Sequence, residues 1–361
     1  MSSSVRKAMV LAAGLGRRLR PLTVHTAKPA LPLMGRPLIE YILCRLARSG
    51  IGDVVVNLHH RAETVTPSLD RAPAGLTVHR SIESEILGTA GGLKKAASHF
   101  VSEEAFLLVN ADTLVDFDLD AMLEVHHDSG ALATLLLRPK PLGSPYSSVT
   151  VGADGGIEAI VPGDVDGEWM FAGVWILSAQ ILERLSGEPA GLEKELLPGL
   201  MAEGSAYASL QETNWITIDT PRRYWGACLT MARERLFEED WNVEWLPEHE
   251  PANVWAGAGT RIESGVDFRG DVVLGEGCQL ARGAHLERAV CWDDVTVASG
   301  VRLENCVVTE GVELRTGMEL ADRLVMEVTQ AESQLRKREI RDNLLIAKLG
   351  ENLTRGRTRG L

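Results

Sequence analysis

Apolar residues recur every six positions in the C-terminal part of the chain, and this period restricts the possible fold more than any other feature. Two such series, continued after a one-residue slip near residue 290, contain Ile262, Phe268, Leu274, Leu280, Leu286, Val297 and Leu303, and Val266, Val272, Cys278, Ala284, Val290, Val295, Val301 and Val307. A six-residue period is typical of short strands that coil into a parallel β-helix, with three repeats per turn and the apolar residues stacked inside. We therefore predict a β-helix over residues 254–322.

The N-terminal part has a different pattern, in which short apolar runs alternate with helical periodicity. Apolar runs predict strands at 9–11, 53–58, 76–79 and 105–112, and the intervening residues predict helices at 38–49, 61–69 and 88–99. This alternation predicts an α/β fold, with a mixed, mostly parallel sheet and helices on both faces. Ligands of such sheets bind beyond the carboxyl ends of the strands.

The remaining elements set the expected domain boundaries. More antiparallel strands are predicted between residues 131 and 177, followed by helices and a closing helix at 221–237. The expected domains are 1–237, a Trp- and Glu-rich connector at 238–253, the β-helix at 254–322, and 323–361. Residues 326–349 predict an amphipathic helix, and residues 354–361 form a basic tail.

Charge and cysteine usage restrict the expected partners and compartment. The chain has 361 residues and a net charge of −13, which argues against general nucleic-acid binding. No apolar run reaches the length of a transmembrane helix, and no secretory signal is visible, so we expect no membrane association. Five scattered cysteines without a Cys-x-x-Cys motif favour reduced thiols and a cytoplasmic location.

The segment from Ala8 to Pro37 carries the strongest chemical signal. A short strand ends in small residues at 12–14 and 16, where the backbone can approach a ligand closely, and Arg17, Arg18, Arg20 and Lys28 follow. Backbone N–H groups and cations in this arrangement favour a polyphosphate ligand. The alternative is an ordinary tight turn. The segment is not a Walker A loop, because no Gly-Lys-Ser/Thr follows.

The combined motif resembles the sugar-1-phosphate nucleotidyltransferases, a family with a Rossmann-like catalytic domain. The matching positions are Gly14-x-Gly16-x-Arg18-x-x-Pro21-x-Thr23, Lys28-Pro29, Gly35-Arg36-Pro37 and Leu87-Gly-Thr-Ala-Gly91. The last of these, together with residues 287–295, is most similar to mannose-1-phosphate guanylyltransferases, which often carry a left-handed β-helix. The resemblance implies Mg²⁺-dependent transfer from GTP to mannose 1-phosphate. The alternatives are UTP or another triphosphate with another sugar 1-phosphate, such as N-acetylmuramate 1-phosphate.

The resemblance also implies roles for individual residues. Arg18 and Lys28 would be catalytic, Arg18 neutralising the leaving phosphates and Lys28 bridging the α-phosphate and the attacking phosphate. The backbone of Ala172 and Gly173 would line the sugar pocket. The expected nucleotide-binding residues are Leu11, Ala12, Ala13, Gly14, Gly16 and Arg17, with Gly88 and Thr89 against the base. For Thr89, the alternative is a simple helix N-cap.

Two aspartates are expected to hold the metal. Asp112 follows a buried strand and matches the family's Mg²⁺ ligand, although Ala111 replaces the usual Gly before it. Asp219 precedes Thr-Pro and is expected to be the second ligand. The alternatives are that Asp219 caps the helix starting at Pro221, or that Thr217 occupies the ligand position.

Three departures from the family pattern favour a second hypothesis. Arg17 stands where the family usually has Thr, the lysine of its Glu-Lys-Pro motif is absent after Ile160, and Asp219 is shifted. A catalytically silent paralogue that binds a nucleotide sugar would tolerate these changes. Acyl transfer is the alternative function for a hexapeptide β-helix, and His285 is the one histidine inside the repeats. We expect the β-helix to serve structure or assembly, including homo-oligomer formation.

Overall fold

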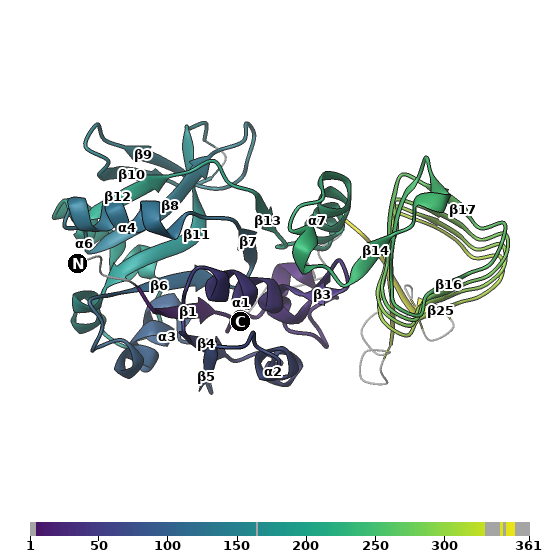
Figure 1. Cartoon of the computed structure of the whole chain (residues 1–361), viewed down its shortest axis with the longest axis horizontal. Helices are drawn as coiled ribbons and strands as arrows, with labels where there is room; N and C mark the ends of the chain where they lie inside the picture. Colours follow the sequence, from purple (N-terminus) through teal and green to yellow (C-terminus); the bar gives the residue numbers. More distant parts are fainter. Residues whose placement is uncertain (1–4, 164, 329–339, 342–343, 351–361) are drawn as a thin grey trace, which may run out of the picture. The chain divides into compact units, whose positions relative to one another are not determined.

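The chain forms two compact units, and the computed structural model describes residues 5–163, 165–328, 340–341 and 344–350 (Figure 1). The first unit contains residues 1–15, 25–30 and 39–216, and the second contains 16–24, 31–38 and 217–361. This division differs from the boundaries expected from the sequence, because segments 16–24 and 31–38 group with the C-terminal strands.

The first unit is built on a nine-stranded mixed sheet. Its central strands run parallel in the order β6 (Ala105–Asn110), β1 (Lys7–Leu11), β4 (Asp53–Leu58) and β5 (Thr77–Ile82). The sheet continues beyond β6 with β11 (Trp169–Ser178), which is antiparallel to β6 and to β8 (Ala133–Pro139). It is completed by β12 (Ala206–Leu210), β9 (Ser148–Val151) and β10 (Ile157–Val161). The α/β prediction is confirmed.

Helices cover both faces of this sheet. Strand side chains alternate between faces, and Met9, Val55 and Leu108 pack in one core with α3 (Gly88–Ala96). On the opposite face, Ile42 of α1 (Leu38–Arg48) lines a small cavity together with Val109. The other helices of this unit include α2 (Ala62–Asp70), α4 (Leu119–Asp128), α5 (Leu192–Glu195) and α6 (Leu197–Ala202).

The parallel strands bring three chain positions together at their carboxyl ends. Leu11 is in register with Asn57 on one side and with Asn110 on the other. The loops that follow these three residues therefore begin side by side, as the sequence predicts for a ligand site.

The second unit contains a parallel β-helix made of three sheets (Figure 1). One sheet contains the parallel strands β15 (Asn253–Gly257), β18 (Asp271–Leu274), β21 (Val290–Cys291), β24 (Val307–Val308) and β27 (Arg323–Glu327). The second contains β16 (Arg261–Ile262), β19 (Gln279–Leu280), β22 (Thr296–Val297) and β25 (Glu313–Leu314). The third contains β17 (Asp267–Arg269), β20 (His285–Glu287), β23 (Arg302–Glu304) and β26 (Glu319–Ala321).

The inner column of the β-helix differs from the predicted series at two positions. Val290 and Val307 pair in register with Val273 and Leu324, and none of these four residues belongs to the interior core cluster. The interior positions are instead Ala289 and Cys291, then Cys306 and Val308. One turn of the β-helix spans 18 residues between the paired positions Asp267 and His285, but 17 residues between Val273 and Val290. The turn therefore loses its residue between His285 and Val290.

The predicted C-terminal helix at 326–349 is wrong where the structure describes this segment. Residues 326–327 belong to β27, and residues 344–348 form β29 (Leu344–Lys348), which pairs antiparallel with β27. Pairing with an existing sheet edge outweighs the helical spacing of the apolar residues. Residues 329–339 and the basic tail at 354–361 lie outside the described residues.

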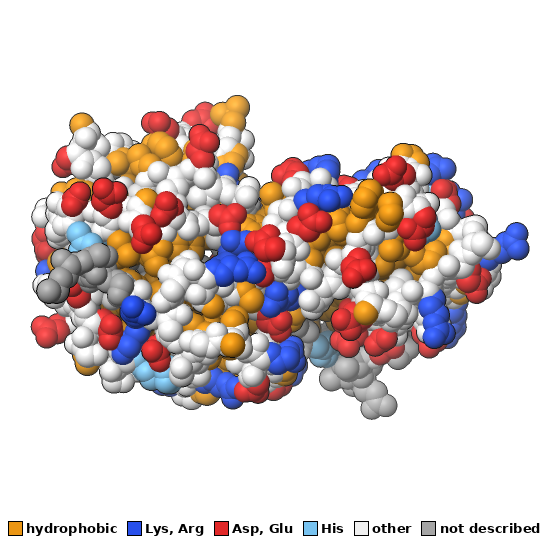
Figure 2. Space-filling view, in the orientation of Figure 1, with side chains coloured by type: hydrophobic (Ala, Val, Ile, Leu, Met, Phe, Trp, Pro, Cys, Tyr) orange, Lys and Arg blue, Asp and Glu red, His pale blue; other side chains and the backbone are white. Residues whose placement is uncertain are grey.

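Helix α7 (Pro221–Glu234) packs on the β-helix within the second unit. Trp225 Nε1–H donates to the carbonyl of Arg288 at 2.8 Å, and Asn253 Nδ2 donates to the carbonyl of Ala232 at 3.2 Å. The side chain of Thr220 caps the helix by accepting from Arg223 N–H. Acidic and basic side chains are interspersed over the visible face of each unit (Figure 2). Among the described helices, none has the length and apolar composition needed to cross a membrane.

Candidate active site

A pocket of about 240 Å³ lies in the first unit at the carboxyl ends of β1, β4 and β6. Its wall brings together most of the residues that the sequence predicts for nucleotide and metal binding in this unit. The lining residues are Leu11, Ala12, Ala13, Gly14, Lys28, Pro29, Asn57, Ile86, Gly88, Thr89, Asn110, Ala111 and Asp112.

Lys28 and Asp112 form an ion pair on the pocket wall. Lys28 Nζ lies 2.9 Å from Asp112 Oδ2, and Thr113 Oγ1–H donates to Asp112 Oδ1 at 3.1 Å. The Lys28 side chain is 12% exposed, whereas that of Asp112 is 42% exposed. A buried cation is screened weakly by solvent, so Lys28 can interact strongly with a phosphate in the pocket.

The loop after β1 presents backbone donors to this pocket. Ala12 N–H is already used, because it donates to Asn57 Oδ1 at 2.7 Å. Within the described chain, the N–H groups of Ala13 and Gly14 have no hydrogen-bond partner. These two donors therefore remain available to a ligand oxygen. An added Cβ at Gly14 would meet nothing within 4 Å, so the protein itself leaves open space there.

The start of α3 forms another part of the wall. Gly88 has φ of +70°, and an added Cβ would lie 2.2 Å from the carbonyl oxygen of Ala190. Thr89 Oγ1 accepts from Leu192 N–H at 2.8 Å. The N-cap position of α3 is Leu87, so the alternative that Thr89 is the N-cap is wrong. Thr89 instead holds the start of α5 against the start of α3.

The predicted sugar-side residues lie at an irregularity of β11. The register of β11 with β8 shifts between Phe171 and Trp175, and Gly173 there has φ of +99°. A Cβ at Gly173 would lie 3.5 Å from the Cβ atoms of Asn110 and Thr113, next to the Asp112 end of the pocket. The carbonyl of Ala172 accepts from Trp215 Nε1–H at 3.1 Å. A backbone sugar site at residues 172–173 remains a prediction.

Gly16, Arg17, Arg18 and Asp219 belong to the second unit. Gly16 has φ of +58° and accepts at its carbonyl from Thr23 Oγ1–H at 2.8 Å, which shapes the turn before Arg17. Asp219 is 4% exposed and pairs with Arg223 at 2.7 Å and with Arg18 at 3.3 Å. The alternative that Asp219 caps α7 is wrong, because Thr220 is the cap.

The predicted metal ligands differ in how accessible they are. Asp112 is a partly exposed carboxylate at a pocket, and this donor fits the preference of Mg²⁺ for one or two carboxylates completed by water and phosphate. Asp219 Oδ2 pairs with two guanidinium groups, which compete with a cation for this oxygen. Over the described residues, no three His, Cys, Asp or Glu side chains are grouped to hold a metal without a substrate.

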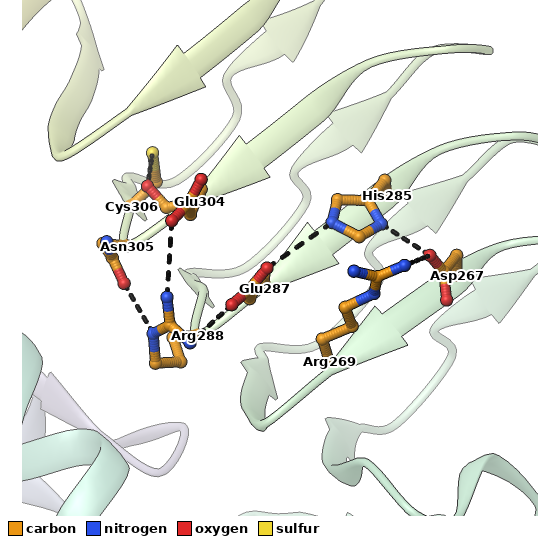
Figure 3. Close-up of polar contacts among 8 residues, drawn as sticks. All are labelled: Asp267, Arg269, His285, Glu287, Arg288, Glu304, Asn305 and Cys306. Carbon is orange, nitrogen blue, oxygen red and sulfur yellow. Dashed lines mark hydrogen bonds and ion pairs between the residues drawn. The ribbon is translucent and has the colours of Figure 1, made fainter.

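His285 of the β-helix lies in a polar network on an outer face (Figure 3). Its Nδ1 is 2.7 Å from Asp267 Oδ2 and its Nε2 is 3.8 Å from Glu287 Oε2. The network continues from Glu287 through Arg288 to Glu304. Nδ1 thus faces a carboxylate of the neighbouring strand β17, and Nε2 faces a carboxylate of its own strand β20. The contact with Asp267 links successive turns, and the arrangement favours a structural role over acyl transfer.

Two residues at the pocket, the lining residue Asn57 and its neighbour Glu83, were not singled out from the sequence. Asn57 and Glu83 are buried and joined by a hydrogen bond of 2.7 Å. The available signal was a polar residue, Asn57, after three consecutive valines of β4.

Comparison with known proteins identifies the family. The family model described as "Nucleotidyl transferase" matches residues 7–234. The chain belongs to the nucleotidyl transferase family. The predicted enzyme class is thereby confirmed for a region that contains the pocket, Arg18 and both aspartates.

Similar proteins show what this family member resembles. A UTP–glucose-1-phosphate uridylyltransferase of Synechocystis sp. is 29% identical over 80% of this chain and 83% of its own length. A probable mannose-1-phosphate guanylyltransferase 3 of Oryza sativa subsp. japonica is 29% identical over 81% and 82%. The crystal structure of HddC from Yersinia pseudotuberculosis complexed with GMP-PN has a TM-score of 0.56 and 25% identity over 62% of this chain and 98% of HddC.

Proposed function

We propose that this nucleotidyl transferase acts on a sugar 1-phosphate, and that its substrates are GTP and mannose 1-phosphate. An oxygen of the sugar phosphate attacks the α-phosphorus of GTP, the bond to the β-phosphate oxygen breaks, and GDP-mannose and pyrophosphate are formed. The choice of GTP and mannose is supported by relatives named mannose-1-phosphate guanylyltransferases and by the GMP-PN complex of HddC.

The observation that carries the proposal is the Lys28–Asp112 pair on the wall of the pocket at the sheet edge. Two anionic substrates repel each other, so the protein must hold them together and stabilise the charge that develops on the leaving group. Lys28 supplies an enclosed cation, and the N–H groups of Ala13 and Gly14 supply neutral donors. Gly14 leaves room for a phosphate to approach the backbone.

A divalent metal is part of the proposal. Asp112 is its proposed ligand in the first unit, and Asp219 is the second ligand expected from the sequence. When bound, Mg²⁺ would neutralise phosphate charge. Lys28 would then orient the phosphate groups, while Arg18, an exposed cation of the second unit, is proposed to act on the leaving phosphates.

A matrix of substrates tests the proposal directly. The purified protein is incubated with Mg²⁺, with each of GTP, UTP, ATP and CTP, and with mannose, glucose or N-acetylmuramate 1-phosphate, while pyrophosphate release is followed. The highest kcat/KM is expected for GTP with mannose 1-phosphate. A higher value for UTP with glucose 1-phosphate would assign the specificity of the Synechocystis relative instead.

The silent-paralogue hypothesis has a separate outcome in the same experiment. It requires no pyrophosphate release with any pair, together with saturable binding of a nucleotide sugar measured by calorimetry. Arg17 in place of the family's Thr and the missing lysine after Ile160 are the features that favour it.

A further inference from the structure

Asn57, which lines the pocket, forms a buried polar pair with Glu83. Asn57 is the penultimate residue of β4 and Glu83 follows β5. Asn57 Nδ2–H donates to Glu83 Oε1 at 2.7 Å, and the two residues are 2% and 3% exposed. A buried amide and a buried carboxylate each cost stability unless their polar atoms have partners. Their remaining partners are therefore informative.

Those partners lie in two different walls of the pocket. Asn57 Oδ1 accepts from Ala12 N–H at 2.7 Å, at the start of the loop after β1. Glu83 Oε2 accepts from Leu87 N–H at 3.3 Å, next to Gly88 at the start of α3. A continuous chain of hydrogen bonds thus joins the loop at residues 12–14 to the wall at residues 87–89.

The chemistry of the two ends fixes the orientation of the Asn57 amide. Glu83 offers only acceptors and Ala12 N–H offers only a donor, so Nδ2 must face Glu83 and Oδ1 must face Ala12. Gly92 of α3 leaves the space for this pair, because an added Cβ would lie 2.7 Å from Glu83 Oε1 and 2.8 Å from Asn57 Nδ2. The Glu83 backbone is also fixed, by Leu58 O and by His59 Nδ1 at 2.9 Å from its carbonyl.

We infer that Asn57 and Glu83 are positioning residues for the triphosphate of the nucleotide substrate. The pair holds the Ala12 peptide, and thereby places the N–H groups of Ala13 and Gly14, which are the donors left for phosphate oxygens. This inference rests on the proposed function, since it assigns a role in binding the same nucleoside triphosphate. Neither side chain needs to touch the substrate.

Exchange of the two side-chain types tests the inference. Asn57→Asp places a carboxylate against Glu83 and removes the donor, while the Asn57→Asp/Glu83→Gln double variant restores one donor and one acceptor at every contact. The Kd for GTP is measured by calorimetry, with melting temperature, KM and kcat recorded in parallel. Asn57→Asp is expected to raise the Kd about tenfold or more, and the double variant to return it to within about threefold of the wild type.

Two further variants separate positioning from folding. Asn57→Ser removes the bond to Ala12 without adding charge, so it keeps the test available if Asn57→Asp does not fold, and the Kd is again expected to rise. Asn253→Asp is the matched control, because Asn253 Nδ2 also donates to a carboxylate, Asp271 Oδ1 at 3.1 Å, in the other unit. It is expected to lower the melting temperature and leave the Kd unchanged.

The outcomes distinguish this inference from the proposed function. A wild-type protein that binds no nucleoside triphosphate would overturn the proposed function and the inference with it. A wild-type protein that binds GTP, with an unchanged Kd in Asn57→Asp and Asn57→Ser, would overturn the inference alone. Loss of binding in the single variants without recovery in the double variant would also overturn it, because amide orientation would then not be the cause.

Discussion

Lys28 places a mostly buried positive charge on the pocket wall. Its replacement tests whether this single cation contributes to the proposed reaction. In Lys28→Met the chain loses the cation but keeps a flexible side chain of similar length. Turnover is expected to fall by a factor on the order of 10²–10³, as found when one charge-stabilising donor is removed from an active site. The measurement is pyrophosphate release under saturating substrates, with circular dichroism to check the fold.

Lys7 provides the matched control for Lys28. Its Nζ also pairs with a carboxylate, Glu103 Oε1 at 3.0 Å, but it lies at the other end of β1. Lys7→Met is expected to retain turnover. Equal activity of the Lys28→Met and wild-type proteins would remove Lys28 from the mechanism.

His126 makes the stability of the first unit depend on pH. Its Nε2 lies 3.1 Å from Ser178 Oγ, whose hydroxyl donates to the carbonyl of Ala131, and its Nδ1 lies 2.9 Å from Thr134 Oγ1. Desolvation by burial, followed by the charge of His127, lowers the pKa of His126 from 6.5 to about 4. The folded state therefore favours the neutral ring.

The sign of this effect follows from proton uptake on unfolding. Below pH 6.5 the unfolded chain binds a proton at His126, whereas the folded chain binds it only near pH 4. The free energy of unfolding therefore falls as the pH falls from 6.5 to about 4. At pH 5 the loss is about 2 kcal/mol. Chemical denaturation at pH 7 and pH 5 should show this loss, reduced in His126→Gln and retained in His127→Gln. An unchanged difference in His126→Gln would contradict the assignment.

Alanine substitutions at two pocket glycines, one at the start of a helix and one in a loop, are expected to have different effects. One strains the backbone and the other obstructs a ligand. In Gly88→Ala the new Cβ would meet Ala190 O at 2.2 Å with φ at +70°, so we expect a loss of roughly 2–3 kcal/mol in stability. In Gly14→Ala nothing in the protein opposes the Cβ, so the melting temperature should stay the same while the Kd for GTP rises. A Gly14→Ala protein with normal affinity would show that no phosphate approaches this backbone.

The metal prediction belongs to the junction between β13 (Trp215–Thr217) and α7. Asp219→Asn keeps an acceptor for Arg223 but removes the charge, so a metal-ligand role predicts a rise of about tenfold or more in the Mg²⁺ needed for half-maximal turnover. Thr220→Val removes the cap of α7 and should cost about 1 kcal/mol without changing the Mg²⁺ requirement. An Asp219→Asn enzyme with ordinary Mg²⁺ dependence would instead leave Asp219 as the partner of two arginines.

Local patterns predicted those elements whose signals lie within one stretch of sequence. Strand β4 has the predicted bounds, and α1 ends before Gly50, which has φ of +81°. The Asn57–Glu83 pair could not be predicted, because it depends on which strands become neighbours in the sheet. The helix expected at 326–349 is wrong for the same reason, since β29 pairs with β27, a strand of the β-helix.

The whole molecule groups its functional residues differently from the linear domains expected from the sequence. The unit that contains the β-helix also contains segment 16–24 with Arg18, and Asp219 with α7. The β-helix is the surface on which α7 packs, and Arg233 adds an ion pair with Asp271 at 3.8 Å. The β-helix therefore has a role beyond assembly, because α7, the helix that follows Asp219, is buried against it.

Removal of the β-helix tests this dependence. In a chain that ends at Val254, Trp225 loses the Arg288 carbonyl to which it donates, and the buried face of α7 loses β18 and β21. We expect a lower melting temperature together with reduced turnover, because Asp219 directly precedes this helix and pairs with Arg223 within it. Trp225→Phe keeps the apolar packing and removes only the hydrogen bond, so it should cost about 1 kcal/mol and leave turnover nearly unchanged. If the shortened chain kept both the melting temperature and the turnover of the full chain, α7 would be stable without the β-helix, and assembly would remain the role to test by light scattering of the two proteins.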